Sequence, residues 1–296
     1  MISVLIPTYN YNAFSLVEEI HKQLVEARIS FEIICLDDGS QSEINKNNNQ
    51  INSLSFSSFD SLKKNIGRSA IRNLLAQKAT FDWLLFLDSD VFPARKNFIH
   101  NYLLCAQQDN VVFCGGITYK NSEHNKRLLR YKFGKIYEEV SVQKRNLNAE
   151  KYFFTSNFFI RKDIFELLKF DEKLLQYGRE DFLFSFNLKK KGVEIMHIEN
   201  EVFHLGLDTN DVFVSKTKKA MENLIFIEKN NLIHKNNILL LKVIDIIDKI
   251  KMTFIIGKFH IFFEKLSIKK SSVFYLNCMK LSYLSYLKTI KWIEKK

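Results

Sequence analysis

The sequence predicts an α/β fold in which helices flank a mostly parallel central sheet. Short strand-like runs are apolar throughout, for example residues 3–7 (SVLIP) and 83–87 (WLLFL). Such runs are typical of strands that helices cover on both faces. Helix-like segments separate them, and residues 13–27 carry apolar side chains at helical spacing. Strands that alternate with helices favour a parallel sheet.

The expected elements follow one another along the first 200 residues. We expect strands at residues 3–7, 31–36, 83–87, 111–114, 152–161 and 193–198, and helices at residues 13–27, 67–79, 96–106, 162–168 and 182–191. Residues 41–50 (QSEINKNNNQ) are polar and are expected to form a surface excursion. No strand is assigned between residues 41 and 60.

Composition and charge divide the chain into a body and a tail. Of the 296 residues, 46% are hydrophobic and 26% charged, as in soluble globular proteins that bury a sizeable core. Residues 231–296 hold 13 lysines and 4 acidic residues, whereas residues 1–230 hold 31 basic and 29 acidic residues. We therefore expect a main domain at residues 1–230 and a basic helical extension at residues 231–296.

Three features of the sequence bear on where the protein works. The cysteines Cys35, Cys105, Cys114 and Cys278 lack the spacing of a disulfide framework or a metal site and fit a reducing compartment. The first residues, MISVLIPTYN, lack the basic start of a signal peptide. No run of about 18 apolar residues predicts a membrane span. We expect a cytoplasmic protein.

Polar residues follow three of the expected strands. PTYN follows the first strand, DDGS follows the second, and DSD, with Asp88 and Asp90, follows WLLFL. In open sheets covered by helices, ligands bind beyond the carboxyl ends of the strands. These residues therefore mark the expected site.

Asp88 and Asp90 are candidate metal ligands. Two carboxylates on either side of a small residue can converge on one divalent cation. Mg²⁺ held by one or two carboxylates together with phosphate oxygens is a common arrangement for a nucleotide, and Mn²⁺ takes the same ligands. The alternative is that DSD is a turn or a helix cap on a solvated loop. Its place after an apolar strand, beside PTYN and DDGS, favours the metal.

Two further groups are candidates for the same site. Glu180 and Asp181 stand where the helix expected at residues 182–191 begins. They either stabilise that helix end or offer a carboxylate that takes a proton from an acceptor hydroxyl. His204 lies just past the last expected strand and is either structural or a ligand of Mn²⁺.

Together these motifs resemble the family-2 glycosyltransferases, which have the GT-A fold. The matching segments, in order, are VLIPTYN (4–10), LDDGS (36–40), NIGRSAIRN (65–73), FLDSD (86–90), CGG (114–116), NFFIRKDIF (157–165), YGREDFLFSFNLKKKG (177–192) and VFHLGLD (202–208). The Gly-x-Glu-Asp segment with a later histidine is similar to the galactosyl- and N-acetylgalactosaminyltransferase-like branch. The chain has no companion to His204 in an HxxH arrangement.

The resemblance implies a role for each matching residue. Pro7, Thr8 and Tyr9 would line the nucleotide pocket, Asp38 would bind the uracil edge, and Arg68 and Arg72 would lie near the base or the diphosphate. Asp88 would touch the ribose or the metal, Asp90 would be the main metal ligand with His204, and Gly115 and Gly116 would let the backbone approach the sugar. Glu180 would hold sugar hydroxyls, and Asp181 would be the catalytic base.

The resemblance also implies a reaction. An inverting, metal-dependent enzyme would move a sugar from a nucleoside-diphosphate donor, a UDP-sugar, to a hydroxyl of a glycan or a lipid-linked saccharide. The expected setting is cell-surface polysaccharide synthesis. The divalent metal, Mn²⁺ or Mg²⁺, would stabilise the leaving diphosphate, and Asp181 would deprotonate the acceptor.

Two other readings stay open for the same residues. A sugar-1-phosphate nucleotidyltransferase also uses acidic metal ligands, but it would carry a Gly-rich phosphate loop where this chain has PTYN. A glycan- or membrane-binding protein on a non-catalytic transferase scaffold would not need an intact DSD or Glu180 and Asp181.

The basic tail is expected to form amphipathic helices. Apolar residues recur at helical spacing at Met252, Ile255, Ile256, Phe259, Phe262, Phe263 and Leu266, and again at Leu276, Met279, Tyr283, Leu287 and Ile290. One reading is a helical subdomain packed on the body. The other is peripheral attachment to the anionic inner face of a membrane, where lysines gain affinity. No nucleic-acid partner is expected, because the tail has no arginine and no recognised motif.

Overall fold

The chain divides into two units. In the computed structural model, which describes residues 1–108, 110–174 and 177–293, unit 1 comprises residues 1–120, 137–173 and 180–206. Unit 2 comprises residues 121–136, 174–179 and 207–296. The boundary expected at residue 230 falls just after α10 (Asn210–Lys229), which belongs to unit 2.

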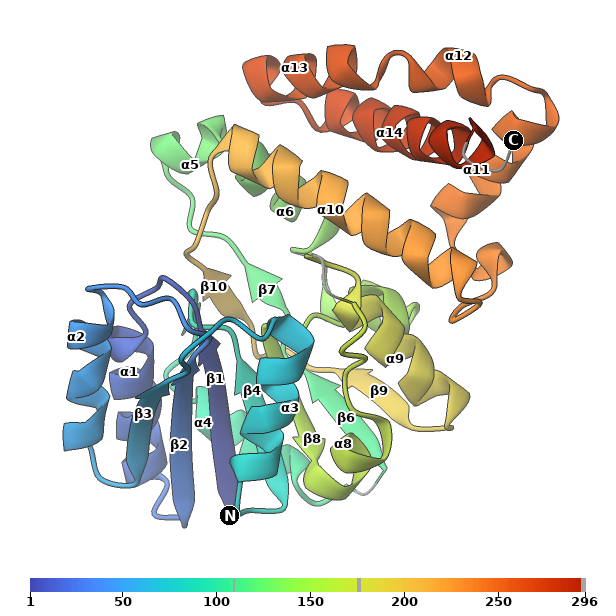
Figure 1. Cartoon of the computed structure of the whole chain (residues 1–296). Helices are drawn as coiled ribbons and strands as arrows, with labels where there is room; N and C mark the ends of the chain where they lie inside the picture. The colour runs from blue at the N-terminus through green and yellow to red at the C-terminus, as the bar shows by residue number, and fades with distance from the viewer. Residues whose placement is uncertain (109, 175–176, 294–296) are drawn as a thin grey trace. The chain divides into compact units, whose positions relative to one another are not determined.

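Unit 1 is built on a seven-stranded sheet with the order β3-β2-β1-β4-β8-β6-β9 (Figure 1). Its strands are β1 (Ile2–Thr8), β2 (Phe31–Asp37), β3 (Ser57–Ser61), β4 (Trp83–Leu87), β6 (Val111–Cys114), β8 (Asn157–Arg161) and β9 (Glu194–His197). β8 runs antiparallel to both of its neighbours, and the other pairs are parallel. The expected α/β fold with a mostly parallel sheet is confirmed.

Helices cover both faces of this sheet and create two apolar cores. α1 (Phe14–Glu26) and α4 (Phe98–Cys105) pack on one face, and α3 (Arg68–Lys78), α8 (Lys162–Leu168) and α9 (Glu180–Lys190) pack on the other. Successive side chains of a strand point to opposite faces. In β4, Leu85 and Leu87 therefore enter the first core, while Leu84 and Phe86 enter the second. An all-apolar WLLFL is what a strand buried on both faces requires.

A second, three-stranded sheet lies beside the first in unit 1. It has the order β5-β10-β7, from β5 (Val91–Pro93), β10 (Val202–His204) and β7 (Ile117–Thr118). β5 and β10 are antiparallel, and Val91 pairs with His204. His204 lies past β9, as the sequence suggested, and it ends a further strand, β10, that the sequence did not predict. This small sheet ties the segment after DSD to His204.

The polar segment after β2 is more ordered than the sequence suggested. It contains the helix α2 (Asn45–Asn48) and the 3₁₀ helix η1 (Asn49–Ser53), and β3 follows at the sheet edge. Asn48 is fully buried. Its side chain accepts a hydrogen bond from Ala13 N–H (2.9 Å) and donates one to Tyr11 O (3.0 Å). Buried amides must be paired in this way, while the other residues of 41–50 are exposed or half-buried, as expected of a surface excursion.

Further short helices lie between the strands, where the sequence showed no clear period. In unit 1 these are α7 (Val142–Asn146) and the 3₁₀ helix η2 (Ala149–Tyr152). η2 ends at Tyr152, the first residue of the strand expected at 152–161, and β8 begins only at Asn157.

Unit 2 is helical. Besides α10 it contains α5 (Glu123–Arg127), α6 (Leu129–Tyr137), η3 (Lys235–Asn237), α11 (Leu239–Lys249), α12 (Thr253–Gly257), α13 (His260–Lys270) and α14 (Val273–Ile293). α12 and α13 both lie along α14 (Figure 1). The Lys218–Glu264 ion pair (2.9 Å) joins α10 to α13, and the Lys288–Glu228 ion pair (3.1 Å) joins α14 to α10. The expected C-terminal helices are confirmed.

Candidate active site

The carboxyl ends of β1 and β2 carry the first group of candidate residues. The Asp38 backbone N–H donates to Thr8 O (2.9 Å), so PTYN and DDGS lie side by side. The Asp38 carboxylate accepts hydrogen bonds from the N–H groups of Ile66 (2.7 Å) and Gly67 (3.0 Å), just before α3. Burial raises the pKa of Asp38, and these two hydrogen bonds act against that rise. Tyr9, which follows Pro7 and Thr8, is exposed.

Two arginines one turn apart on α3 each hold a carboxylate. Arg72 Nη2 donates to Asp88 Oδ1 (2.5 Å), and Arg68 Nη1 donates to Glu180 Oε1 (3.2 Å). Arg72 is 2% exposed, whereas Arg68 is 46% exposed. The i, i+4 spacing places both guanidinium groups on one face of the helix. α3 therefore links the end of β4 to the start of α9.

The charge of Asp88 is stabilised by its surroundings. Burial alone would raise the pKa of Asp88. The Arg72 guanidinium outweighs burial, with help from Arg68 and His204, and the pKa of Asp88 lies below its ordinary value. Asp88 is therefore an ionised carboxylate whose first partner is an arginine.

Asp90 faces a different partner, His204. Asp90 Oδ2 lies 3.7 Å from His204 Nε2, and the Asp90 carbonyl accepts the N–H of Leu205 (2.8 Å). A Cβ atom on Gly206 would come within 2.3 Å of Asp90 Oδ2, so only glycine leaves room for this carboxylate. The His204 ring stacks on Tyr119, with 5.8 Å between the ring centroids. Two strand ends and a glycine thus fix the Asp90–His204 pair.

Asp90 and His204 fit a divalent metal as a partial ligand set. A carboxylate oxygen and an imidazole nitrogen are both common ligands. Among residues 1–108, 110–174 and 177–293, no group of three or more His, Cys, Asp and Glu side chains is arranged to hold a metal. The remaining ligands would have to come from water and a diphosphate, as is usual for Mg²⁺.

Tyr11 is a neighbour of this pair that the sequence did not single out. Burial is the main cause of the raised pKa of Tyr11, and the nearby Asp90 carboxylate raises it further. The Tyr11 carbonyl accepts the Thr8 hydroxyl (3.1 Å), which fixes the loop after β1. The loop after β1, DSD and His204 therefore meet at one edge of the sheets of unit 1.

Glu180 and Asp181 occupy the first turn of α9. The backbone before it is unusual, because Gly178 and Arg179 both have positive φ angles, 87° and 80°. Such an angle is uncommon for arginine. Glu180 is 5% exposed, and its Oε2 atom is buried with no hydrogen-bond partner in the described chain. Asp181 Oδ1 accepts the N–H of Phe182 (2.7 Å).

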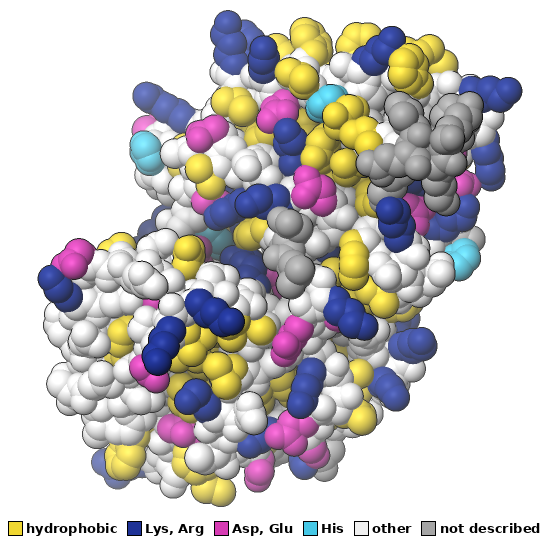
Figure 2. All heavy atoms as spheres, viewed as in Figure 1, with side chains coloured by type: hydrophobic (Ala, Val, Ile, Leu, Met, Phe, Trp, Pro, Cys, Tyr) yellow, Lys and Arg dark blue, Asp and Glu magenta, His cyan; other side chains and the backbone are white. Residues whose placement is uncertain are grey.

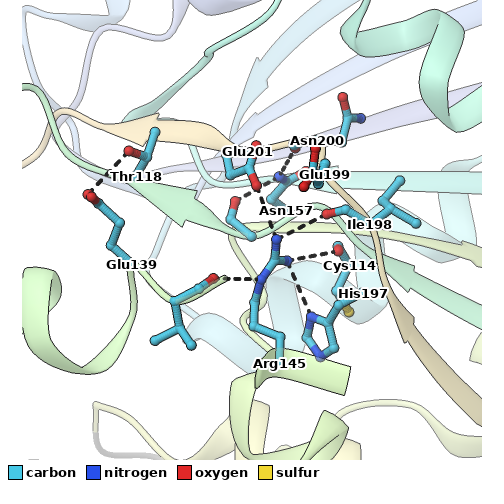
Figure 3. Close-up of polar contacts among 12 residues, drawn as sticks. Cys114, Thr118, Glu139, Arg145, Asn157, His197, Ile198, Glu199, Asn200 and Glu201 are labelled. Atoms are coloured by element: carbon cyan, nitrogen blue, oxygen red, sulfur yellow. Dashed lines mark hydrogen bonds and ion pairs between the residues drawn. The ribbon is translucent and has the colours of Figure 1, made fainter. Parts of the chain in front are cut away.

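Arg145 of α7 is the centre of a buried polar network (Figure 3). Gly115 and Gly116 lie against residues of this network. Arg145, only 1% exposed, donates to the carbonyls of Val140 (3.0 Å), Cys114 (3.3 Å) and Ile198 (3.1 Å) and pairs with Glu201 (3.1 Å). A Cβ atom on Gly116 would come within 2.5 Å of Arg145 Nη1. One on Gly115 would come within 2.2 Å of the Asn200 carbonyl. Contacts within the protein therefore already require glycine at both positions.

His197 belongs to the same network and makes stability depend on pH. Its Nε2 lies 2.9 Å from the Ala149 carbonyl, and Arg145 Nη1 lies 3.5 Å from its Nδ1. Burial lowers the pKa of His197 to about 4; the bond to Ala149 opposes this, and the charge of Arg145 adds to it. Between about pH 6.5 and pH 4, His197 is protonated in the unfolded chain but stays largely neutral in the folded chain. Lowering the pH through this range therefore favours the unfolded chain.

The expected result is a loss of stability on acidification that depends on His197. Between pH 6.5 and 4 this residue alone should lower the free energy of unfolding by about 3 kcal/mol. Denaturant unfolding at several pH values would show this loss in the native chain and a shallower one in His197→Gln. The exposed His100 is the control, since His100→Gln should follow the native chain. Equal pH profiles for the native chain and His197→Gln would contradict the prediction.

Comparison with known proteins identifies the family. The model of a family described as "Glycosyl transferase family 2" matches residues 3–168, which include β1, DSD and β8. The chain belongs to glycosyl transferase family 2. An uncharacterized glycosyltransferase of Rickettsia conorii is 32% identical over 131 residues, and one of Rickettsia felis is 31% identical over the same length. These alignments cover 42% of this chain and 20% of each relative.

Solved structures of other glycosyltransferases share the fold of this family-2 chain. S. aureus TarS 1–349 in complex with UDP superposes with a TM-score of 0.51 at 16% identity, over 76% of this chain and 65% of that TarS fragment. GalNAc-T7 with UDP, GalNAc and Mn²⁺ gives 0.51 at 16% identity, over 70% of this chain and 44% of GalNAc-T7. Mannosyltransferase PcManGT from Pyrobaculum calidifontis, with GDP-Man and Mn²⁺, gives 0.50 at 13% identity, over 76% of this chain and 64% of PcManGT. The expected GT-A fold is thereby confirmed.

Proposed function

We propose that this family-2 protein moves a sugar from a nucleoside-diphosphate donor, a UDP-sugar, to a hydroxyl group, with inversion at the anomeric carbon. The Asp90–His204 pair carries this proposal, because it offers two metal ligands at the edge of the sheets where PTYN also lies. The family match supports the transfer of a sugar. Similar folds were solved with UDP or GDP-Man, two of them with Mn²⁺.

The donor would bind at the ends of β1, β2 and β4. Pro7, Thr8 and Tyr9 would line the nucleotide pocket, with Asp38 toward the uracil and Asp88 toward the ribose. Arg72 is tied to Asp88, so its proposed role is to hold that carboxylate in place beside the nucleotide. Arg68 is half-exposed and would reach the diphosphate more readily than Arg72. Gly115 and Gly116 would let the backbone approach the sugar.

The acidic residues of α9 would bind sugar hydroxyls and deprotonate the acceptor. Asp181 would take the proton from the acceptor hydroxyl as that oxygen attacks the anomeric carbon. Glu180 would accept a hydrogen bond from a sugar hydroxyl, since its buried Oε2 has no hydrogen-bond partner among the described residues. When bound at Asp90 and His204, Mn²⁺ or Mg²⁺ would supply positive charge against the leaving diphosphate.

The acceptor class we propose is a glycan or a lipid-linked saccharide. The setting would be cell-surface polysaccharide synthesis. The similarity between the Gly-x-Glu-Asp segment at residues 178–181 and the galactosyl- and N-acetylgalactosaminyltransferase-like branch supports this choice.

A donor screen with product analysis tests the reaction class. UDP- and GDP-sugars would be offered with Mn²⁺ and a saccharide acceptor, and the released phosphate species would be identified. We expect a nucleoside diphosphate. Release of pyrophosphate would instead indicate a nucleotidyltransferase. A lack of product, together with no metal-dependent heat on titration with UDP, would indicate a non-catalytic binding protein.

Asp181→Asn tests the proposed base within that screen. We expect transfer to fall by roughly 10²- to 10⁴-fold, the usual contribution of general base catalysis. UDP binding, measured by calorimetry, should remain close to that of the native chain. Asp163→Asn is a matched control, because Asp163 also lies in the first turn of a helix, α8, and is largely exposed. If Asp181→Asn keeps its transfer activity, another group is the base.

A further inference from the structure

In helices α12 and α13 of unit 2 the buried residues are small, whereas several large apolar residues are exposed. The buried positions are Thr253, Gly257 and Ser267. A Cβ atom on Gly257 would lie 3.0 Å from the backbone nitrogen of Tyr286, so α12 approaches the backbone of α14 closely. Small residues let helix backbones approach one another this closely. Soluble helices normally bury their large apolar residues instead.

The outward side chains of this segment are large and apolar. Their exposed fractions are 54% for Phe254, 50% for Ile255, 50% for Phe259, 53% for Ile261 and 55% for Phe262. Ile255, Phe259 and Phe262 recur at helical spacing in this segment and are exposed. The sequence had left both a packed helical subdomain and membrane attachment open. Water alone gives no reason to present five such side chains within nine residues, because exposed apolar area costs free energy.

Lysines are interspersed with these apolar side chains. Lys251, Lys258, Lys265, Lys269 and Lys270 are all exposed and form no ion pair with any described residue. Lys258 Nζ lies 4.3 Å from the centroid of the Phe254 ring. Glu264 is the one acidic residue in the sequence from 249 to 293, and Lys218 neutralises it. Figure 2 shows hydrophobic side chains next to Lys and Arg where Figure 1 draws α12 and α13.

We propose that the outer surface of α12 and α13 binds an anionic lipid membrane. We call this surface the docking face and define it by Phe254, Ile255, Lys258, Phe259, Ile261, Phe262, Lys265 and Lys269. The aromatic and aliphatic side chains enter the boundary between headgroups and acyl chains, and the lysines meet lipid phosphates. No helix in residues 1–108, 110–174 and 177–293 is long and apolar enough to cross a bilayer, so the binding is peripheral.

The positive charge of the docking face favours a membrane over a second copy of the chain as its binding partner. In a two-fold symmetric contact the same patch faces itself. Lys258, Lys265 and Lys269 of one copy would then face the same lysines of the other copy. An anionic lipid surface instead supplies the opposite charge over the whole face. The proposal rests on the proposed function only in giving such an enzyme access to a lipid-linked acceptor.

Vesicle flotation of the full chain tests the docking face. The probes are phosphatidylcholine vesicles with half their lipid replaced by phosphatidylglycerol, and pure phosphatidylcholine vesicles. We expect binding to the anionic vesicles that falls with added salt. Replacement of Lys258, Lys265 and Lys269 by glutamine should lower the partition coefficient on the order of 100-fold. Replacement of Phe259 and Phe262 by serine should lower it by roughly tenfold or more.

Matched variants in unit 1 are the controls. Lys22, Lys78 and Lys96 are exposed lysines of unit 1, and Phe56 and Leu147 are exposed apolar residues there. The same substitutions at these positions should leave vesicle binding unchanged. Equal loss from both variant sets, or equal binding to both kinds of vesicle, would overturn the proposal. A dimer of the native chain that the Phe259→Ser, Phe262→Ser variant abolishes would overturn it in favour of a second copy.

Hydrolysis of the soluble donor separates this proposal from the proposed function. The docking variants should release nucleoside diphosphate from a UDP-sugar at the native rate, because no residue of the docking face belongs to unit 1. Vesicle binding without any donor hydrolysis in the native chain would support the docking face and refute the enzyme. Donor hydrolysis without vesicle binding would support the enzyme and refute the docking face.

Discussion

Replacement of Asp90 by alanine is expected to lower the rates of both sugar transfer and donor hydrolysis on the order of 10³-fold. The side chain is 30% exposed and lies 3.7 Å from His204, so its loss removes a proposed metal ligand without opening a core cavity. Steady-state release of nucleoside diphosphate, measured over a range of Mn²⁺ concentrations, would show the effect. The folded chain should keep its native unfolding midpoint.

Asp60→Ala is the matched control for this substitution. Asp60 is an exposed aspartate on β3, and its Oδ1 accepts the N–H of Ser61. We expect this variant to keep full activity. Normal activity of Asp90→Ala at saturating Mn²⁺ would show that the pair formed by Asp90 and His204 is not the metal site.

Replacement of Arg145 by methionine is expected to lower the free energy of unfolding by about 3 kcal/mol or more. Three backbone carbonyls would lose their donor, and Glu201 would lose its buried partner. Methionine has a similar length, so the loss is mainly one of hydrogen bonds and charge. Denaturant unfolding at pH 7 measures the change.

Arg95→Met supplies a control that shares the same carboxylate. Arg95 also pairs with Glu201, at 3.5 Å, but it is 46% exposed. Exposed ion pairs contribute roughly 0–1 kcal/mol, so this variant should unfold almost as the native chain does. A similar small effect in both variants would mean that the network around Gly116 does not hold unit 1 together.

The central sheet was predictable because its signal is local. β4 and β6 are continuous apolar runs, and β1 and β2 are mostly apolar, as strands buried on both faces require. The three strands β5, β7 and β10 are only two or three residues long. A period of two cannot be recognised over so few residues, and the second sheet therefore did not appear in the sequence.

The orientation of α12 and α13 was not predictable from periodicity. Helical spacing shows which residues share a face, but not which face is turned inward. At Ile255, Phe259 and Phe262 the shared face is exposed. The buried face is made of Gly257 and Ser267, whose small side chains leave no signal in a hydrophobic pattern.

The candidate site was located from the sequence, but its pairings were not. Residues after the strands lie at one edge because parallel strands end together. The partners of Asp88 and Asp90, which are Arg72 and His204, are fixed by the packing of α3 and by the pairing of β5 with β10. Arg145 lies in VQKRN, a segment that reads like a solvated helix face, and nothing local marks it as buried.

Arg68 and Arg72 of α3 also change the electrostatic potential at the sheet edge that carries the candidate site. Counted from the sequence, Asp88, Asp90, Glu180 and Asp181 form an acidic group that would repel an incoming diphosphate. In the folded chain Arg72 neutralises the charge of Asp88, and Arg68 neutralises the charge of Glu180. The local potential is therefore far less negative than the count of acids suggests, and a polyanion can approach an edge that its residues alone would seem to forbid.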